Sequence, residues 1–197
     1  MAQLSIGVFC GSCPGNEPEH LDAGARLGRL LAERGHRLVY GAGGVGVMGA
    51  VARGAAAGGG EILGVIPEFL RAREMADDLP GQQLVLTGDL LERKRVMLGA
   101  ADGFVALPGG FGTLDEVAEV LSTAAIGLPV GPLALVDVGG EWAPFLAGVN
   151  GLARRGFVRR VDLCHLVRGP EAALELVEAV VARPGQVRSS AMRTSST

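Results

Sequence analysis

The residues with the clearest chemical potential lie in segment 107–116, where an apolar run meets three glycines and then a helical pattern. The glycines leave the main chain unobstructed, so N–H groups at the start of a helix are free to bind an anion such as a phosphate. Thr113 and Glu116 also have the T-x-x-E spacing of a helix-capping box, which is a structural alternative. The two interpretations are compatible, because a capping carboxylate is held rigidly at the edge of a pocket.

A second glycine-rich turn, residues 40–49, lies between an apolar run and a helical pattern. Gly41, Gly43 and Gly46 fit the G-x-G-x-x-G dinucleotide fingerprint, which requires an acidic residue at the end of the following strand. Glu61 has the right separation but opens its strand, so it is poorly placed to bind a ribose. A tight turn with close helix–strand packing is an equally good interpretation of this segment.

A third loop, residues 11–15, follows the first apolar run and also offers main-chain N–H groups to a phosphate or ribose. Cys10 and Cys13 have the C-x-x-C spacing of a redox pair. Pro14 and Gly15 prolong the loop where a redox motif would begin a helix, so buried or unreactive thiols are the favoured interpretation.

A charged run, residues 92–95, precedes the fifth apolar run. Such a run is most often a solvated helix face. Arg93 and Lys94 point about 100° apart on a helix, so at most part of the run can line one pocket.

Short apolar runs and helical patterns alternate along the chain, which indicates a parallel sheet with helices on both faces. This is a Rossmann-like doubly wound α/β fold in a single domain, residues 1–182, followed by a flexible C-terminal tail, residues 183–197. Ligands bind at the carboxyl edge of such sheets, where the three glycine-rich segments should converge. The predicted strands cover residues 4–10, 36–40, 61–66, 83–87, 103–107 and 133–138, and the predicted helices cover 18–34, 46–57, 89–100, 113–125, 142–154 and 171–182.

Composition excludes several classes of protein. The chain has 197 residues, of which 48% are hydrophobic and 20% charged, with a net charge of −3, so a disordered chain and a basic nucleic-acid binder are excluded. The N-terminus lacks the basic region of a signal peptide, and the longest uncharged stretch, residues 120–136, is too short and proline-rich for a membrane span. Three cysteines make no disulfide framework and no cluster with metal-ligand spacing. We expect a cytoplasmic protein without metal, nucleic-acid or membrane partners.

The segment Pro108–Glu116 resembles the P-G-G-x-G-T-x-x-E signature of the Lonely Guy (LOG) family, and Arg93-Lys94 matches the family's second signature at the right separation. LOG proteins are cytokinin riboside 5′-monophosphate phosphoribohydrolases, once described as lysine decarboxylases. Further similarity extends over roughly residues 4–182. The sequence departs from the family at Leu90-Leu91, where Met-His is usual, and at Cys13, which puts the identity of the base in question more than the chemistry.

The resemblance implies a set of site residues. Arg93 and Glu116 would be catalytic, and substrate would contact Gly11, Ser12, Gly43, Gly44, Met48, Glu74, Lys94, Pro108, Gly109, Gly110, Phe111, Gly112, Thr113, Leu114, Asp115 and Ser122. No cofactor and no metal are implied. A homodimer or higher homo-oligomer with the pocket near the subunit interface is expected.

The implied reaction is hydrolysis of the N-glycosidic bond of an N6-substituted adenosine 5′-monophosphate, which releases the base and ribose 5-phosphate. Glu116, placed in the first helical turn, would stay ionised beside the helix dipole and stabilise positive charge on the ribose. The alternatives are the same chemistry on another nucleoside monophosphate, a non-catalytic nucleotide- or cofactor-binding protein, and, less well supported, an NAD-type oxidoreductase. A lysine decarboxylase is disfavoured, because Lys94 is the only lysine available for a pyridoxal Schiff base.

Overall fold

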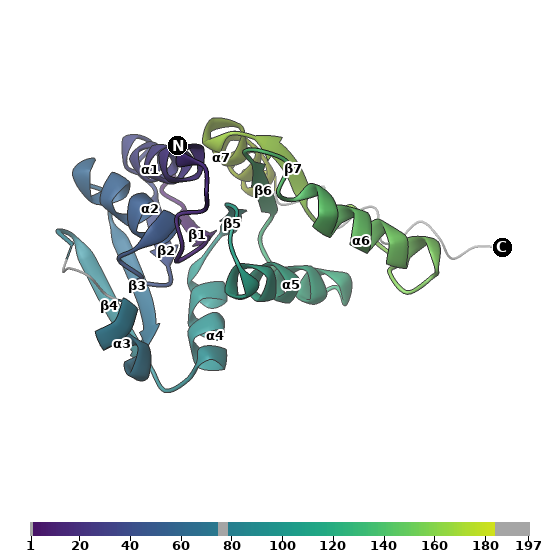
Figure 1. Cartoon of the computed structure of the whole chain (residues 1–197), viewed down its shortest axis with the longest axis horizontal. Coiled ribbons are helices and arrows are strands. Elements are labelled where there is room, and N and C mark those ends of the chain that lie inside the picture. The colour runs from purple at the N-terminus through teal and green to yellow at the C-terminus, as the bar shows by residue number, and fades with distance from the viewer. Residues whose placement is uncertain (1, 75–78, 184–197) are drawn as a thin grey trace.

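The computed structural model describes residues 2–74 and 79–183 (Figure 1). Its centre is a seven-stranded sheet in which every strand pair is parallel, with the order β4-β3-β2-β1-β5-β6-β7. The chain runs outward from β1 in one direction as far as β4 and then returns to β5 on the other side of β1. The strands are β1 Ser5–Phe9, β2 Arg37–Tyr40, β3 Ile62–Pro67, β4 Gln82–Thr87, β5 Gly103–Ala106, β6 Leu133–Asp137 and β7 His165–Arg168.

The central strands β1 and β5 pack with unusually little space between them. Gly7 pairs with Phe104 across the two strands, and a Cβ at Gly7 would lie 2.6 Å from the Phe104 ring. The Phe104 ring stacks on Phe9 with 5.4 Å between centroids. Both rings are fully buried, so they anchor the pair of strands whose carboxyl ends carry two of the glycine-rich loops.

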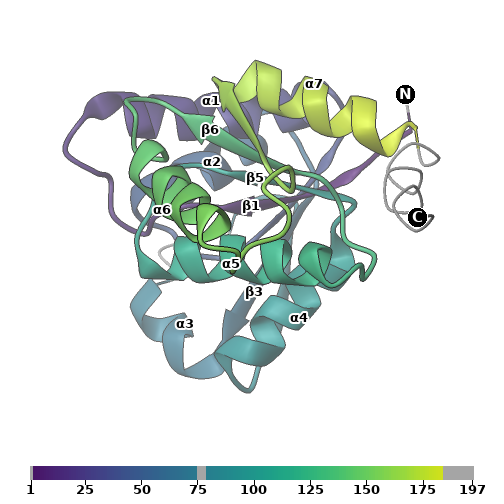
Figure 2. The same ribbon diagram turned by 90° about the vertical axis from the view of Figure 1, so that its right-hand side faces the viewer.

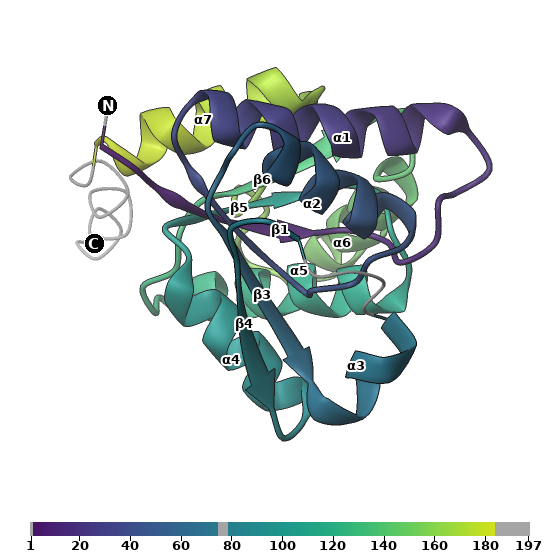
Figure 3. The ribbon, with the colours of Figure 1, turned by 90° about the vertical axis from the view of Figure 1, so that its left-hand side faces the viewer.

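Helices cover both faces of the sheet (Figures 2 and 3). One face packs against α1, α2 and α7, and the other packs against α4, α5 and the start of α6. No helix among residues 2–74 and 79–183 is long and apolar enough to cross a membrane. The helices are α1 Pro18–Glu33, α2 Gly46–Ala57, α3 Glu68–Glu74, α4 Leu90–Ala100, α5 Phe111–Ala125, α6 Ala143–Arg154 and α7 Pro170–Val181.

The structure confirms the predicted single α/β domain with a doubly wound parallel sheet, and it adds two elements. Helix α3 has only seven residues, too few for a helical pattern to be detected. Strand β7 is an edge strand that is mostly exposed, so it lacks the continuous apolar run of a buried strand. The predicted tail, apart from Arg183, lies outside the described residues.

The main chains of helices α1 and α2 pack closely at glycine residues. A Cβ at Gly28 would collide with the carbonyl oxygen of Val51 and lie 2.7 Å from the main-chain nitrogen of Ala55. A Cβ at Gly54 would likewise collide with the carbonyl oxygen of Ala25. This close contact places the start of α2, and therefore the glycine-rich turn before it, directly against the sheet edge.

We predict that Gly28→Ala destabilises the protein by about 1–3 kcal/mol, because the added methyl group forces α1 away from α2. The matched control is Gly99→Ala in α4, where a Cβ meets no atom within 4 Å. The free energy of unfolding of that variant should rise by up to about 1 kcal/mol, because alanine has a higher helix propensity than glycine. Urea denaturation measures both free energies, and equal effects of the two substitutions would contradict the packing argument.

Candidate active site

Three glycine-rich loops converge at Gly11, as the sequence predicts for loops after the first, second and fifth strands. The Gly11 N–H donates to the Pro108 carbonyl oxygen at 3.2 Å, and its own carbonyl oxygen accepts from the Met48 N–H at 3.0 Å. The Gly43 N–H in turn donates to the Met48 sulfur at 3.1 Å. The β1–α1, β2–α2 and β5–α5 loops are therefore joined into one main-chain cluster at the carboxyl edge.

Side chains would obstruct this cluster at several positions. A Cβ at Gly109 would lie 2.7 Å from the Gly11 nitrogen and would collide with the Thr113 hydroxyl. Gly46 has φ of +60° and packs against the Ser12 carbonyl, with no room for a Cβ. Ala42 also has positive φ, at +57°, a conformation that is uncommon for residues other than glycine.

The N-terminus of α5 opens onto this cluster. The helix begins at Phe111 with Gly110 at the N-cap and no side-chain cap, and its first main-chain hydrogen bond runs from the Leu114 N–H to the Gly110 carbonyl oxygen at 3.1 Å. The N–H groups of residues 111–113 therefore have no acceptor within the helix. A Cβ at Gly110 or Gly112 would meet no atom within 4 Å, so the main chain here is accessible to a ligand.

The predicted capping box is wrong. Because α5 begins two residues before Thr113, that residue lies inside the first turn and its side chain is buried. Glu116 then falls in the second turn, so it does not cap the helix, and the predicted stabilisation of its charge by the helix dipole is also wrong. The glycines before Phe111 allow the helix to start earlier than a Thr N-cap would.

Arg93 reaches the site from α4 by lying on the main chain of Gly41. Its Nη2 donates to the Gly41 carbonyl oxygen at 3.1 Å, and a Cβ at Gly41 would collide with the guanidinium. Among the described residues, Arg93 Nε is the one buried side-chain nitrogen or oxygen without a hydrogen-bond partner. A buried unpaired donor is costly in the absence of a ligand.

Glu116 is held in an environment that favours its neutral form. Burial raises its pKa from 4.5 to about 7, the positive charge of Arg93 opposes that rise, and the neighbouring Asp115 adds to it. The carboxyl is thus close to half ionised at neutral pH, which is the range in which a carboxylate works best as a general base.

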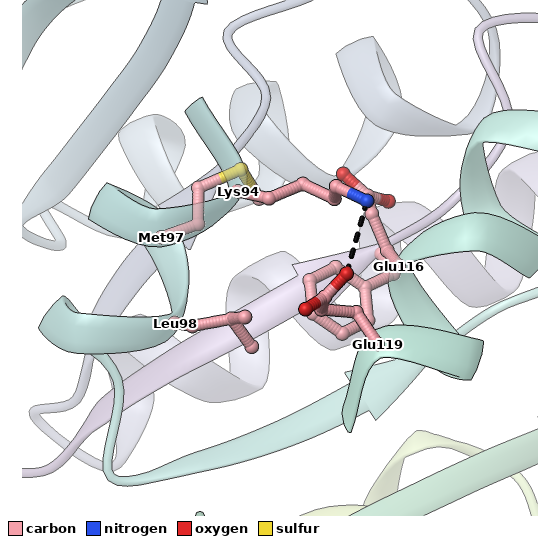
Figure 4. Close-up of a pocket in the computed structure, with 6 residues that line it drawn as sticks. Lys94, Met97, Leu98, Glu116 and Glu119 are labelled. Atoms are coloured by element: carbon pink, nitrogen blue, oxygen red, sulfur yellow. Dashed lines mark hydrogen bonds and ion pairs between the residues drawn. The ribbon is translucent and has the colours of Figure 1, made fainter. Parts of the chain in front are cut away.

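Lys94 joins α4 to α5 through two carboxylates, of which Figure 4 shows that of Glu119. Its Nζ lies 2.9 Å from Asp115 and 3.1 Å from Glu119. The hydrogen bond to Asp115 is the main cause that raises the pKa of Lys94 above its ordinary value, against the effect of burial and with a further contribution from Glu119. Lys94, Glu116 and Glu119 line a narrow crevice whose apolar walls are Phe9, Met97 and Leu98.

Most of the predicted site residues come together here, but Ser122 and Phe111 do not join the loop cluster. Ser122 lies roughly 16 Å along α5 from its first residue, and its hydroxyl bonds to the Glu119 carbonyl oxygen. Phe111 has a 92% exposed side chain that points into solvent. Glu74 is the last residue of α3, and the contacts of its side chain fall outside the described part of the chain.

Sequence reasoning missed two residues that shape the site and the role of a third. Phe9 lines the crevice beside Glu116, and Glu119 holds Lys94. Gly41, which the sequence assigned only to a dinucleotide fingerprint, supports Arg93. The spacing of Asp115 and Glu119 is a signal that was available, because residues four apart lie on the same face of a helix and both can meet one cation.

The C-x-x-C motif is not arranged for redox chemistry. Burial raises the pKa of the Cys10 thiol well above its ordinary value, Glu116 adds to this and Arg93 opposes it. Cys13 is exposed, and no disulfide joins the two. A thiol held protonated in this way is a poor nucleophile, so the structure favours the interpretation of Cys10 as a buried core residue.

Comparison with known proteins identifies the family. The family model described as "Possible lysine decarboxylase" matches residues 48–180. The cytokinin riboside 5′-monophosphate phosphoribohydrolase LOG of Oryza sativa subsp. japonica is 40% identical over 172 residues, which cover 87% of this chain and 70% of the relative. The chain belongs to the LOG family. The corresponding LOG7 of Arabidopsis thaliana is 39% identical over 85% of this chain and 76% of its own length.

Membership of the LOG family confirms the resemblance carried by the Pro108–Glu116 signature and the prediction of an enzyme of the phosphoribohydrolase type. The fold comparison is consistent with it. The molybdenum cofactor binding protein from Rippkaea orientalis superposes with a TM-score of 0.69 at 24% identity, over 92% of this chain and 99% of that protein. At this identity the likeness establishes the shared Rossmann-like fold alone.

We predict that Glu116→Gln stabilises this LOG protein in a pH-dependent way. Between pH 4.5 and about 7 the folded state holds the Glu116 proton that the unfolded state has lost, so the stability of the wild type falls as pH rises. The glutamine does not titrate. The free energy of unfolding of the variant, relative to that of the wild type, should therefore rise by about 3 kcal/mol from pH 4 to pH 8. Urea denaturation at both pH values measures it, and an equal difference at the two would contradict the burial of the carboxyl.

Proposed function

We propose that the chain hydrolyses the N-glycosidic bond of a nucleoside 5′-monophosphate, with an N6-substituted adenosine 5′-monophosphate as substrate, and releases the free base and ribose 5-phosphate. The observation that carries the proposal is the meeting of Glu116 and Arg93 with the open N-terminus of α5. The activity named for the LOG relatives of rice and Arabidopsis, on cytokinin riboside 5′-monophosphates, supports the choice of substrate.

The 5′-phosphate would bind at the start of α5. The free N–H groups of residues 111–113 supply donors, and the positive end of the helix dipole favours an anion there. The Gly11 loop and the Gly43–Gly44 turn border the same cluster and would hold the ribose. In this proposal the sugar would lie next to Glu116.

Bond cleavage builds positive charge on the ribose, as in other glycoside hydrolyses. The electrons of the bond between C1′ and the base nitrogen leave with the base, which takes up a proton from solvent. Water adds to C1′ and gives its proton to the Glu116 carboxylate, which also stabilises the developing charge. The guanidinium of Arg93 would orient the ribose or phosphate through its planar donors, and its unpaired Nε would gain a partner on binding.

We predict that Glu116→Gln and Arg93→Gln each lower kcat by at least about 100-fold, because each removes a group acting on the reacting sugar. The substrates are AMP and isopentenyladenosine monophosphate, and chromatography follows the base and ribose 5-phosphate. Arg95→Gln is the matched control, since Arg95 lies two residues further along α4 with an exposed side chain, and it should keep wild-type activity.

Other results of this assay would redirect the assignment. Turnover of AMP alone would point to adenine rather than a cytokinin as the base. No release of base by folded wild type from either compound, followed by turnover of another nucleoside monophosphate, would support the same chemistry on that substrate. Tight binding of nucleotide without turnover of any would identify a binding protein. Wild-type rates for Glu116→Gln would exclude the proposed role of the carboxylate.

We further propose a homodimer or higher homo-oligomer in the cytoplasm. Helix α6 projects away from the sheet (Figure 1), and large apolar side chains are exposed on it and on the loop after it, with Leu152 at 47%, Phe157 at 77% and Val161 at 51% exposure. Exposed apolar groups clustered in this way are typical of an association surface.

We predict that the wild type sediments as at least a dimer and that Phe157→Asp shifts it toward the monomer, because a charge is costly to bury at the centre of an apolar contact. Sedimentation velocity at micromolar concentration measures this. Phe69→Asp, an exposed position on α3, serves as the control and should leave the assembly intact. A monomeric wild type would disprove the proposal.

A further inference from the structure

Outside the site already described, a buried histidine joins two loops at the carboxyl edge of the sheet. His20, in the first turn of α1, is 9% exposed. Its Nε2 lies 2.7 Å from Glu141 Oε1 in the β6–α6 loop, and its Nδ1 lies 3.1 Å from the Glu17 carbonyl oxygen. Among the described residues, Glu141 is the charged side chain that pairs with the His20 ring.

Both partners of His20 are hydrogen-bond acceptors. Partial burial by itself raises the pKa of Glu141, but the hydrogen bond from His20 and those from main-chain N–H groups, foremost that of Gly139, lower it to about 2. The carboxylate and the Glu17 carbonyl oxygen are therefore acceptors only, so both ring nitrogens of His20 must donate. Only the imidazolium form carries a proton on each nitrogen.

A second histidine provides an internal contrast. The Leu4 N–H donates to His36 Nδ1 at 3.3 Å, so this nitrogen carries no proton. His36 Nε2 lies 2.8 Å from Glu178 and donates to it. His36 is therefore the neutral Nε2–H tautomer, although it too contacts a glutamate. The difference between the two rings comes from the main-chain group that each one faces.

The His20–Glu141 pair organises both of the loops that it connects. A Cβ at Gly15, where φ is +76°, would lie 2.6 Å from His20 Nδ1, so the β1–α1 loop packs its main chain directly on the ring. On the other side, Glu141 accepts from the Gly139 N–H at 2.8 Å and the Val138 N–H at 3.3 Å. The pair thus ties the β1–α1 loop to the β6–α6 loop across the edge of the sheet.

We propose that the His20–Glu141 ion pair is a positioning device for substrate binding: the imidazolium holds the β1–α1 loop, and with it Gly11 and Ser12, in the conformation that contacts the nucleotide. This inference rests on the proposed function for the identity of the ligand. His20 and Glu141 touch no reacting atom, so their removal should weaken binding and leave the chemical step nearly unchanged.

The first test uses kinetics and calorimetry on the full chain with AMP. Glu141→Gln and His20→Gln should each raise KM and the dissociation constant about 5-fold to 20-fold, with kcat within about 2-fold of the wild type. Glu178→Gln is the matched control, because it breaks the other histidine–glutamate pair at α7 and should lower the melting temperature without changing KM. Unchanged AMP affinity in Glu141→Gln, with only the melting temperature lowered, would overturn the proposal.

The second test measures the proton directly. The chain has three histidines, so their ring nitrogens can be resolved in a nitrogen-15 correlation spectrum. At pH 7, His20 should show two protonated nitrogens and His36 one. A neutral His20 at pH 7 would overturn the assignment. If the wild type shows no hydrolysis of any nucleotide, the proposed function fails while this spectrum and the AMP affinity still test the pair.

Discussion

The main-chain contacts of Gly11 are the constraint on which the rest of the site depends. Its N–H binds the loop after β5 and its carbonyl binds the first turn of α2, which satisfies peptide groups that would otherwise be buried without partners. The approach is possible because Gly109 and Gly46 leave no Cβ between the chains. A ligand site formed by main-chain atoms depends little on side chains, so a change such as Cys13 is compatible with the same geometry.

Charge at the site is balanced between two helices. Helix α4 brings Arg93 and Lys94, and helix α5 brings Glu116 with the two carboxylates that hold Lys94. Burial favours a neutral Glu116 and Arg93 favours its ionised form, so the carboxyl responds to small changes nearby. Arg93 in turn carries an unpaired Nε. The free protein therefore keeps one buried donor without a partner beside a carboxyl whose pKa lies near neutral pH.

The sequence predicted the buried strands and the helices between them, because continuous apolar runs and helical periodicity are strong local signals. It could not reveal β7, whose exposed side chains break the apolar pattern, or α3, which is too short to show a period. The T-x-x-E spacing misplaced the start of α5, since Gly110 can end the loop without a side-chain cap. Long-range contacts such as His20 with Glu141, 121 residues apart, leave no trace in local spacing.

The position of Lys94 gives the site an unusual experimental property. It is the only lysine in the chain, it lies within α4, and its ammonium is held by two carboxylates of α5. A lysine-specific protease therefore has a single cleavage point, which is reached only when α4 opens locally. The rate at which the chain is cut into two fragments would report how often this one helix separates from its neighbour, without any label or engineered residue.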